Sequence, residues 1–209
     1  MKKRESKKDT AAATKRKYLL VGTITLLAFL AALAFDLRIS LFVVSLGTPL
    51  LTTLMLWVTY LSTIVIAIFS TLVVYATDRK RLGALWASLL VTLTSVALLK
   101  VIVGRLRPFQ LGFFVTNAPL SLIKESYGRW DFSFPSSHVA TALAVLPFMP
   151  KKWRVPWIVF SVLVMFSRVY FGLHYLSDVI AGAAIGFVIA TIIKAKMPKL
   201  LKGKLELIK

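Results

Sequence analysis

Residues 50 to 76 read LLTTLMLWVTYLSTIVIAIFSTLVVYA and contain no charged side chain. At a rise of about 1.5 Å per residue, a helix of this length exceeds the hydrocarbon core of a bilayer, which is about 30 Å thick. The whole chain has 209 residues, of which 58% are hydrophobic. Its mean hydropathy of +0.79 is high for a soluble domain, so the stretch predicts a helix that crosses a membrane.

Similar apolar runs flank this stretch on both sides. Together they predict an all-α, polytopic membrane helix bundle with six spans: Tyr18–Phe35, Leu50–Ala76, Leu82–Val103, His138–Met149, Val155–Phe171 and Val179–Ile193. The fourth run is short, and by its length alone it could be re-entrant. We expect residues 18–194 to form one membrane domain between two basic cytoplasmic tails, residues 1–17 and 195–209.

The basic residues indicate which side of the membrane each loop occupies. The formal net charge is +19, and most of the 27 Lys and Arg residues fall in four clusters: Lys2 to Lys17, Arg79 to Arg81, Lys151 to Arg154, and Lys194 to Lys209. Six crossings place all four clusters on one side, which the positive-inside rule makes the cytoplasm. The crossing interpretation of the fourth run is therefore favoured, with both termini cytoplasmic. Membrane sidedness, rather than binding of nucleic acid, explains the charge.

A second group of polar residues lies at the opposite, extracytoplasmic ends of the predicted spans. Both histidines of the chain belong to this group. Its members are Lys100, Arg107, His138, Arg168, His174 and Asp178. Ionisable groups at this depth are costly and usually functional. Singly, each has a structural explanation, since Lys100 could snorkel from a helix end and Asp178 could stabilise a helix dipole. Their common location favours one shared site instead.

The spacing of these residues predicts how they meet. Lys100 and Arg107 share a helix face if the helix continues past Gly104, so that two cations would converge on one anion. Arg105 lies about 140° around that helix from Lys100 and is expected to point elsewhere. His174 and Asp178 are four residues apart, so the carboxylate could accept a hydrogen bond from one ring nitrogen and leave the other free to attack.

The segment from Pro135 to His138 adds a helix start to this site. A proline followed by Ser136 and Ser137, directly before an apolar run, predicts unpaired backbone N–H groups at the positive end of a helix dipole. Such a helix start is suited to bind a phosphate. The chain has no cysteine, which excludes a thiolate nucleophile and a cysteine-based metal site.

The same residues resemble the three motifs of the type 2 phosphatidic acid phosphatase superfamily. The motif K-x-x-x-x-x-x-R-P corresponds to Lys100–Pro108, P-S-G-H to Pro135–His138, and S-R-x-x-x-x-x-H-x-x-x-D to Ser167–Asp178. Ser137 replaces the glycine of the second motif, and its side chain could crowd a phosphate or donate a further hydrogen bond to it. The six-span plan is similar to the bacterial membrane branch of that superfamily, which includes phosphatidylglycerophosphatase B.

The resemblance implies a membrane lipid phosphatase that works through a phosphohistidine intermediate. It makes His174 the nucleophile, Asp178 its orienting partner and His138 the general acid. The phosphoryl oxygens would be held by five further residues: Lys100, Arg107, Ser136, Ser137 and Arg168. No metal or other cofactor is implied, because the acidic residues of that face form no evident carboxylate pair: Asp36, Glu125, Asp131 and Asp178.

Three functions remain open at this stage. The resemblance implies hydrolysis of a lipid phosphomonoester, with phosphatidylglycerophosphate as the first candidate. An extracytoplasmic site also suits undecaprenyl diphosphate, which is the second. The third is a non-catalytic transporter of anions or lipids, although the chain has no internal repeat of the kind that many transporters contain. The pattern predicts a lipid phosphate and the bilayer as partners, and it does not determine the oligomeric state.

Overall fold

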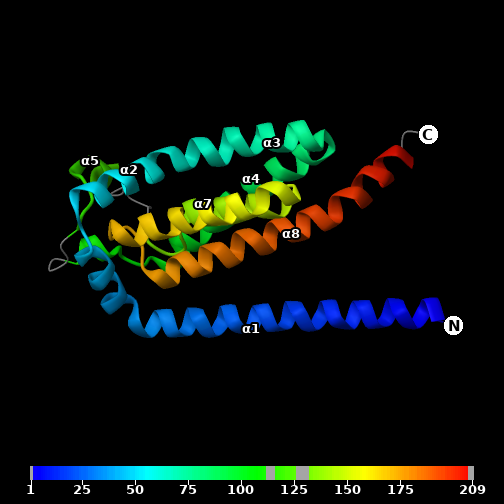
Figure 1. The fold of residues 1–209 in the computed structure, drawn as a ribbon, viewed down its shortest axis with the longest axis horizontal. Coiled ribbons are helices and arrows are strands. Elements are labelled where there is room, and N and C mark those ends of the chain that lie inside the picture. The colour runs from blue at the N-terminus through cyan, green and yellow to red at the C-terminus, as the bar shows by residue number, and fades with distance from the viewer. Residues whose placement is uncertain (1, 112–115, 126–131, 207–209) are drawn as a thin grey trace.

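The computed structural model describes residues 2–111, 116–125 and 132–206, and every regular element within them is a helix. Asp131 lies outside the described residues. The predicted all-α fold is confirmed for the described part of the chain (Figure 1). The main helices are α1 (Lys2–Ser45), α2 (Pro49–Ile64), α3 (Ser70–Thr77), α4 (Leu82–Val103), α7 (Lys151–Tyr170) and α8 (Leu176–Glu206).

The 50–76 stretch forms one long helical segment, as predicted. Its first turn is capped by Thr48, whose side chain accepts a hydrogen bond from the Leu51 N–H at 3.3 Å, and Pro49 stands at the first helical position. A π-helical turn, η1 (Val65–Phe69), joins α2 to α3 without ending the helix. The segment ends at Thr77, and Asp78 separates it from the 3₁₀ turn η2 (Arg79–Arg81).

Among the residues that the structure describes, four helical segments are long and apolar enough to cross a membrane: Leu19–Ser45, Pro49–Thr77, Arg79–Gln110 and Leu176–Lys196. They coincide with the first, second, third and sixth predicted spans. The fourth predicted span forms only the short α6 (Ser137–Val145) and the 3₁₀ turn η4 (Leu146–Phe148). The fifth lies in α7, which carries basic residues near both ends. Six crossings therefore stay a prediction.

Two helices extend beyond their predicted limits. The first span was expected to begin after residue 17 and end at Phe35, but α1 continues without a break from Lys2 to Ser45. Likewise, α8 continues past Ile193 to Glu206. The reason is that lysine, arginine and glutamate mark the edge of the apolar layer but are good helix formers, so they do not end a helix.

The two ends of the bundle differ in charge. The N-terminal end of α1, the C-terminal end of α8, the turn between α3 and α4 and the start of α7 all lie at one end (Figure 1). Most of the basic clusters belong to these segments. The opposite end holds the start of α2, the end of α4, the short α5 (Leu120–Glu125), the end of α7 and the start of α8.

The short helix α6 lies inside the bundle, where it packs most extensively against α8 and α4. Its residues Val139, Ala140 and Ala142 are fully buried. Two glycines of α8 make this packing close: a Cβ on Gly182 would lie 2.6 Å from the Ser136 carbonyl oxygen, and one on Gly186 only 1.9 Å from the Ala140 carbonyl oxygen. Glycines four residues apart let two helix backbones approach each other within a membrane.

Candidate active site

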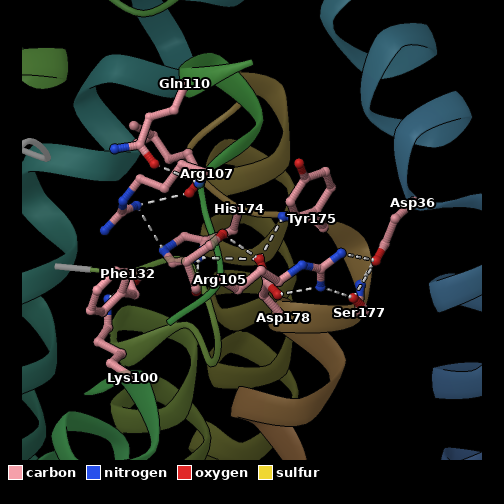
Figure 2. Close-up of polar contacts among 12 residues, drawn as sticks. Asp36, Lys100, Arg105, Arg107, Gln110, Phe132, His174, Tyr175, Ser177 and Asp178 are labelled. Atoms are coloured by element: carbon pink, nitrogen blue, oxygen red, sulfur yellow. Dashed lines mark hydrogen bonds and ion pairs between the residues drawn. The ribbon is translucent and has the colours of Figure 1, made fainter. Parts of the chain in front are cut away.

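The predicted site residues lie together at the end of the bundle that is opposite the chain termini. Lys100 is in the last turn of α4, Arg168 in the last turn of α7 and Asp178 in the first turn of α8. Arg107 directly precedes the 3₁₀ turn η3 (Pro108–Gln110), and His174 lies between α7 and α8. All five side chains are buried. The structure thus brings the first and third motifs into contact (Figure 2).

The turn after α4 brings Lys100 and Arg107 together in a way that differs from the expected continuous helix. The helix ends at Val103, and Gly104 adopts the left-handed conformation with φ 61°. Arg107 is extended before Pro108, as a residue before proline should be. Its Nη1 donates to the Leu173 carbonyl oxygen at 2.8 Å and lies 3.3 Å from Nε2 of His174.

The surroundings of His174 fix its tautomer. Its Nδ1 lies 2.7 Å from the Ser133 carbonyl oxygen, and because a carbonyl can only accept, Nδ1 carries the proton. Nε2 therefore presents a lone pair toward Arg107. Burial, followed by the positive charges of Arg107, Arg168 and Lys100, lowers the pKa of His174 well below its ordinary value of 6.5. The ring is neutral at pH 7, which is the form a nucleophile needs.

Asp178 contacts His174 differently from the prediction. The expected hydrogen bond to the ring is absent, since Oδ2 of Asp178 lies 3.7 Å from Nδ1. That oxygen instead accepts from the Ser133 hydroxyl at 2.5 Å and the Tyr175 N–H at 2.9 Å. The geometry of residues four apart on a helix does not apply, because α8 begins only at Leu176. Asp178 thus holds Ser133, and the carbonyl of Ser133 holds the ring.

Arg105 belongs to this site, although the sequence directed it elsewhere. Its Nη1 donates to Oδ1 of Asp178 at 2.7 Å, and its Nη2 donates to Oδ2 of Asp36 at 2.8 Å (Figure 2). The helical-wheel argument fails because the helix ends two residues before Arg105. The contact between Asp36, on α1, and Arg105 could not be predicted from the local sequence, because the two residues are 69 positions apart in the chain.

The second motif forms the start of α6, as predicted, and lies within the same charged environment. Ser136 is the N-cap residue, and its buried hydroxyl has no hydrogen-bond partner among the residues that the structure describes. His138 interacts electrostatically with Arg168, His174, Arg107 and Lys100. A buried hydroxyl without a protein partner next to a cluster of cations is suited to donate to an anion.

An apolar cavity of about 280 Å³ reaches the other side of His138. It lies between the α2–η1 segment, α4 and α6, and Ser137 and His138 contribute to its wall. The Thr63 hydroxyl, on the same wall, lies 3.5 Å from Nε2 of His138. His138 therefore stands at the boundary between the cationic site and an apolar space. Ser137, which replaces the glycine of the motif, also lines that space.

The charged groups of the site suit an anion. Lys100, Arg107 and Arg168 supply three positive charges around two imidazoles. Within the described ranges, no group of three or more His, Cys, Asp or Glu side chains is placed to hold a metal ion. The side chains of Glu125 and Asp131 are not among those described.

Comparisons with known proteins place this arrangement in a family. The profile described as the PAP2 superfamily matches residues 81–202, which include all three motifs. An undecaprenyl-diphosphatase of Sulfolobus acidocaldarius is 33% identical over 125 residues, covering 58% of this chain and 57% of the relative. A lipid A 4'-phosphatase of Bacteroides thetaiotaomicron is 38% identical over 95 residues, or 42% of this chain and 40% of the relative.

A third relative carries the name of a phosphatidylglycerophosphatase. A phosphatidylglycerophosphatase B of Bacillus subtilis is 36% identical over 78 residues, or 31% of this chain and 38% of the relative. The matched part of this chain thus spans about half or less of the length of these curated relatives.

Two crystal structures share the fold. A transmembrane PAP2 type phosphatidylglycerolphosphate phosphatase of B. subtilis has a TM-score of 0.63 at 24% identity, over 85% of this chain and 96% of that one. Aquifex aeolicus LpxE has a TM-score of 0.65 at 20% identity, over 77% of this chain and 95% of that one. Since the matched profile covers more than half of its length, the chain belongs to the PAP2 superfamily, as its three motifs predict.

Proposed function

We propose that this protein is a membrane lipid phosphatase that transfers a phosphoryl group first to His174 and then to water. The observation that carries this proposal is the neutral, buried His174, whose Nε2 lone pair faces Arg107 among three cations. A neutral imidazole whose Nδ1–H is held by a carbonyl group keeps the lone pair of Nε2 for attack on phosphorus. The cations would stabilise the charge that develops on the phosphoryl oxygens.

The reaction would take place in two steps. In the first, Nε2 of His174 bonds to phosphorus, the bond from phosphorus to the lipid oxygen breaks, and His138 gives its proton to that oxygen. In the second, water attacks the phosphohistidine, His138 takes a proton from the water, and the N–P bond breaks to release phosphate. Lys100, Arg107, Arg168 and the hydroxyl of Ser136 would hold the phosphoryl oxygens, with Ser137 beside them at the start of α6.

The apolar cavity beside His138 supports a lipid as the leaving group. The group that His138 protonates must leave on the side of His138, where the cavity of about 280 Å³ is lined mainly by apolar residues. An apolar chain in that space would bury hydrocarbon while its phosphate stays among the cations. The first substrate we propose is phosphatidylglycerophosphate, because a relative in sequence and a structural neighbour carry that name. The second is undecaprenyl diphosphate, because the longest of the reported sequence matches is to an undecaprenyl-diphosphatase.

A panel of purified lipids tests the substrate. The protein in detergent micelles is given phosphatidylglycerophosphate, undecaprenyl diphosphate and lipid A, and released phosphate is measured with and without EDTA. His174→Ala is the control. We expect release from at least one lipid by the wild type, none by the variant, and little effect of EDTA, because three cations already neutralise the phosphoryl group. If none of these lipids releases phosphate, the proposed function is wrong, and a metal-reversible loss in EDTA contradicts the metal-independent mechanism.

We further propose that the chain crosses the membrane six times, with both termini in the cytoplasm and the active site on the extracytoplasmic side. The support is the distribution of charge, since both termini and the basic turns occupy the end of the bundle that lies away from the site. The short α6 lies inside the bundle, where the surrounding helices rather than lipid enclose its ends.

A further inference from the structure

We propose that Arg105 and Asp36 are positioning residues that hold Ser133 and, through its carbonyl group, the nucleophilic ring of His174. The inference rests on the proposed phosphatase function and adds residues that lie outside the three motifs. The contacts described for the two side chains join them to each other and to Asp178, Ser177 and Tyr175, and none of these contacts is to His174. Their effect on catalysis therefore has to pass through the residues that they bind.

Ser133 is held by Arg105 in two ways. The backbone N–H of Ser133 donates to the Arg105 carbonyl oxygen at 2.8 Å. The hydroxyl of Ser133 donates to Asp178, whose other carboxylate oxygen accepts from the Arg105 guanidinium at 2.7 Å. The carbonyl of Ser133, between these two attachments, accepts from Nδ1 of His174. Arg105 therefore fixes both the position of that carbonyl and the carboxylate that anchors the same residue.

Asp36 fixes the guanidinium in turn. It accepts from Nη2 of Arg105 at 2.8 Å and from the Ser177 N–H at 2.9 Å, and the Ser177 hydroxyl donates to it as well. On the other side, the Tyr175 ring lies 4.0 Å from Cζ of Arg105, a cation–π contact. A planar guanidinium that bridges two carboxylates in this way has little freedom to turn.

The network also balances charge next to the cationic site. Asp36 and Asp178 have side-chain exposures of 5% and 0%, and Arg105 is the cation that bridges them. Removing Arg105 would leave two buried carboxylates without that cation, and the cost is large when one partner of a buried pair is lost. We expect Asp178 then to release or reorient Ser133, so that His174 loses the acceptor that fixes its tautomer.

Asp36 lies on α1, outside the residues 81–202 that match the family profile. The first helix, which has only 11% of its membrane-spanning window buried, is thus connected to the nucleophile through the carboxylate of Asp36. This assigns α1 a role in catalysis beyond anchoring the chain.

The test compares Arg105→Gln, Arg105→Lys and Asp36→Asn with Arg38→Gln, a matched control at an exposed arginine of the same end of α1. Hydrolysis of phosphatidylglycerophosphate in micelles gives kcat and KM. Because the Arg105 guanidinium is bound to Asp36 and Asp178, we expect Arg105→Gln to act on the orientation of His174, and so to lower kcat by about 10- to 100-fold with KM changed by less than about threefold. Asp36→Asn should lower kcat by about three- to tenfold, since Asp178 keeps its arginine.

A second readout does not depend on turnover. In a His138→Gln background, ¹⁵N-histidine labelling leaves one ring, whose nitrogen shifts report its tautomer. We expect the single Nδ1–H tautomer with Arg105 and a mixture of tautomers in Arg105→Gln, with Arg105→Lys between them. If Arg105→Gln does not fold, Arg105→Lys and Asp36→Asn give the same comparison.

Two results would overturn the inference: a kcat for Arg105→Gln within about twofold of Arg38→Gln, or a loss of kcat while His174 keeps one tautomer. If the wild type hydrolyses no lipid phosphate, the proposed function fails, whereas the tautomer of His174 still decides the role of Arg105.

Discussion

Ser133 connects the two halves of the site, because its hydroxyl binds Asp178 and its carbonyl binds His174. A peptide carbonyl is a fixed acceptor that cannot be protonated near neutral pH, so it holds one tautomer over a wide pH range. The nucleophile is thus oriented by a backbone carbonyl group. The carboxylate of Asp178 acts on the ring indirectly, because it binds Ser133, which carries that carbonyl.

The lowered pKa of His174 predicts a specific pH dependence. Because the folded-state pKa lies below 6.5, the ring stays neutral at pH 6.5 and gains its proton only as the pH falls through the lowered value. The acidic limb of kcat/KM that belongs to His174 should therefore lie below pH 6.5. The measurement is a pH titration of the ¹⁵N-labelled ring in His138→Gln. A ring that is half protonated at or above pH 6.5 would contradict this account.

The three motifs predict which residues form the site but not how they are held. Lys100, Arg107 and His174 can be predicted because their spacing resembles family motifs, and the structure brings them together. Arg105 could not be placed, because its direction depends on the left-handed turn at Gly104 that ends α4. The contact from Asp36 spans 69 residues along the chain, and local patterns carry no information about such a contact.

At the scale of elements, the position of α6 depends on its contact with α8. The hydrophobic pattern predicts the helices themselves, because apolar runs bounded by charges determine where helices enter and leave lipid. It does not predict that the fourth run is an interior helix, since burial in protein and burial in lipid both favour apolar residues. Gly182 and Gly186 distinguish burial against protein from burial in lipid, because a Cβ at either position would clash with the backbone of the neighbouring α6 segment.

A single methyl group tests this packing. In Gly186→Ala the new Cβ would lie 1.9 Å from the Ala140 carbonyl oxygen, so α6 and α8 must separate. Overpacking of this kind costs about 1–3 kcal/mol, and it would also displace Ser136 and His138 at the start of α6. We expect a lower Tm in detergent and a lower kcat.

Gly22→Ala on α1 is the matched control, because a Cβ there meets no atom within 4 Å. Alanine should stabilise that helix slightly, by about 0.5–1 kcal/mol. An equal Tm for the two variants would show that the close contact between α6 and α8 does not contribute to stability.

At the scale of the whole molecule, the separation of the basic end from the site predicts opposite sides of the membrane. The chain contains no cysteine, so a single introduced cysteine reports its own accessibility. In right-side-out vesicles, Lys124→Cys on α5 should react with a membrane-impermeant maleimide, whereas Lys80→Cys should react only after permeabilisation. The reverse pattern would place the active site in the cytoplasm, and labelling of both positions in sealed vesicles would contradict the crossing model.

The central claim is that His174 carries the phosphoryl group, and the most direct test is to trap it there. Protein mixed with ³²P-labelled phosphatidylglycerophosphate, or with labelled undecaprenyl diphosphate if the panel selects it, is quenched in alkali within milliseconds. The label on the chain is then measured in wild type, His138→Ala and His174→Ala. The account predicts acid-labile label on the wild type, slower labelling of His138→Ala, and none on His174→Ala. Hydrolysis or labelling that survives His174→Ala would contradict it.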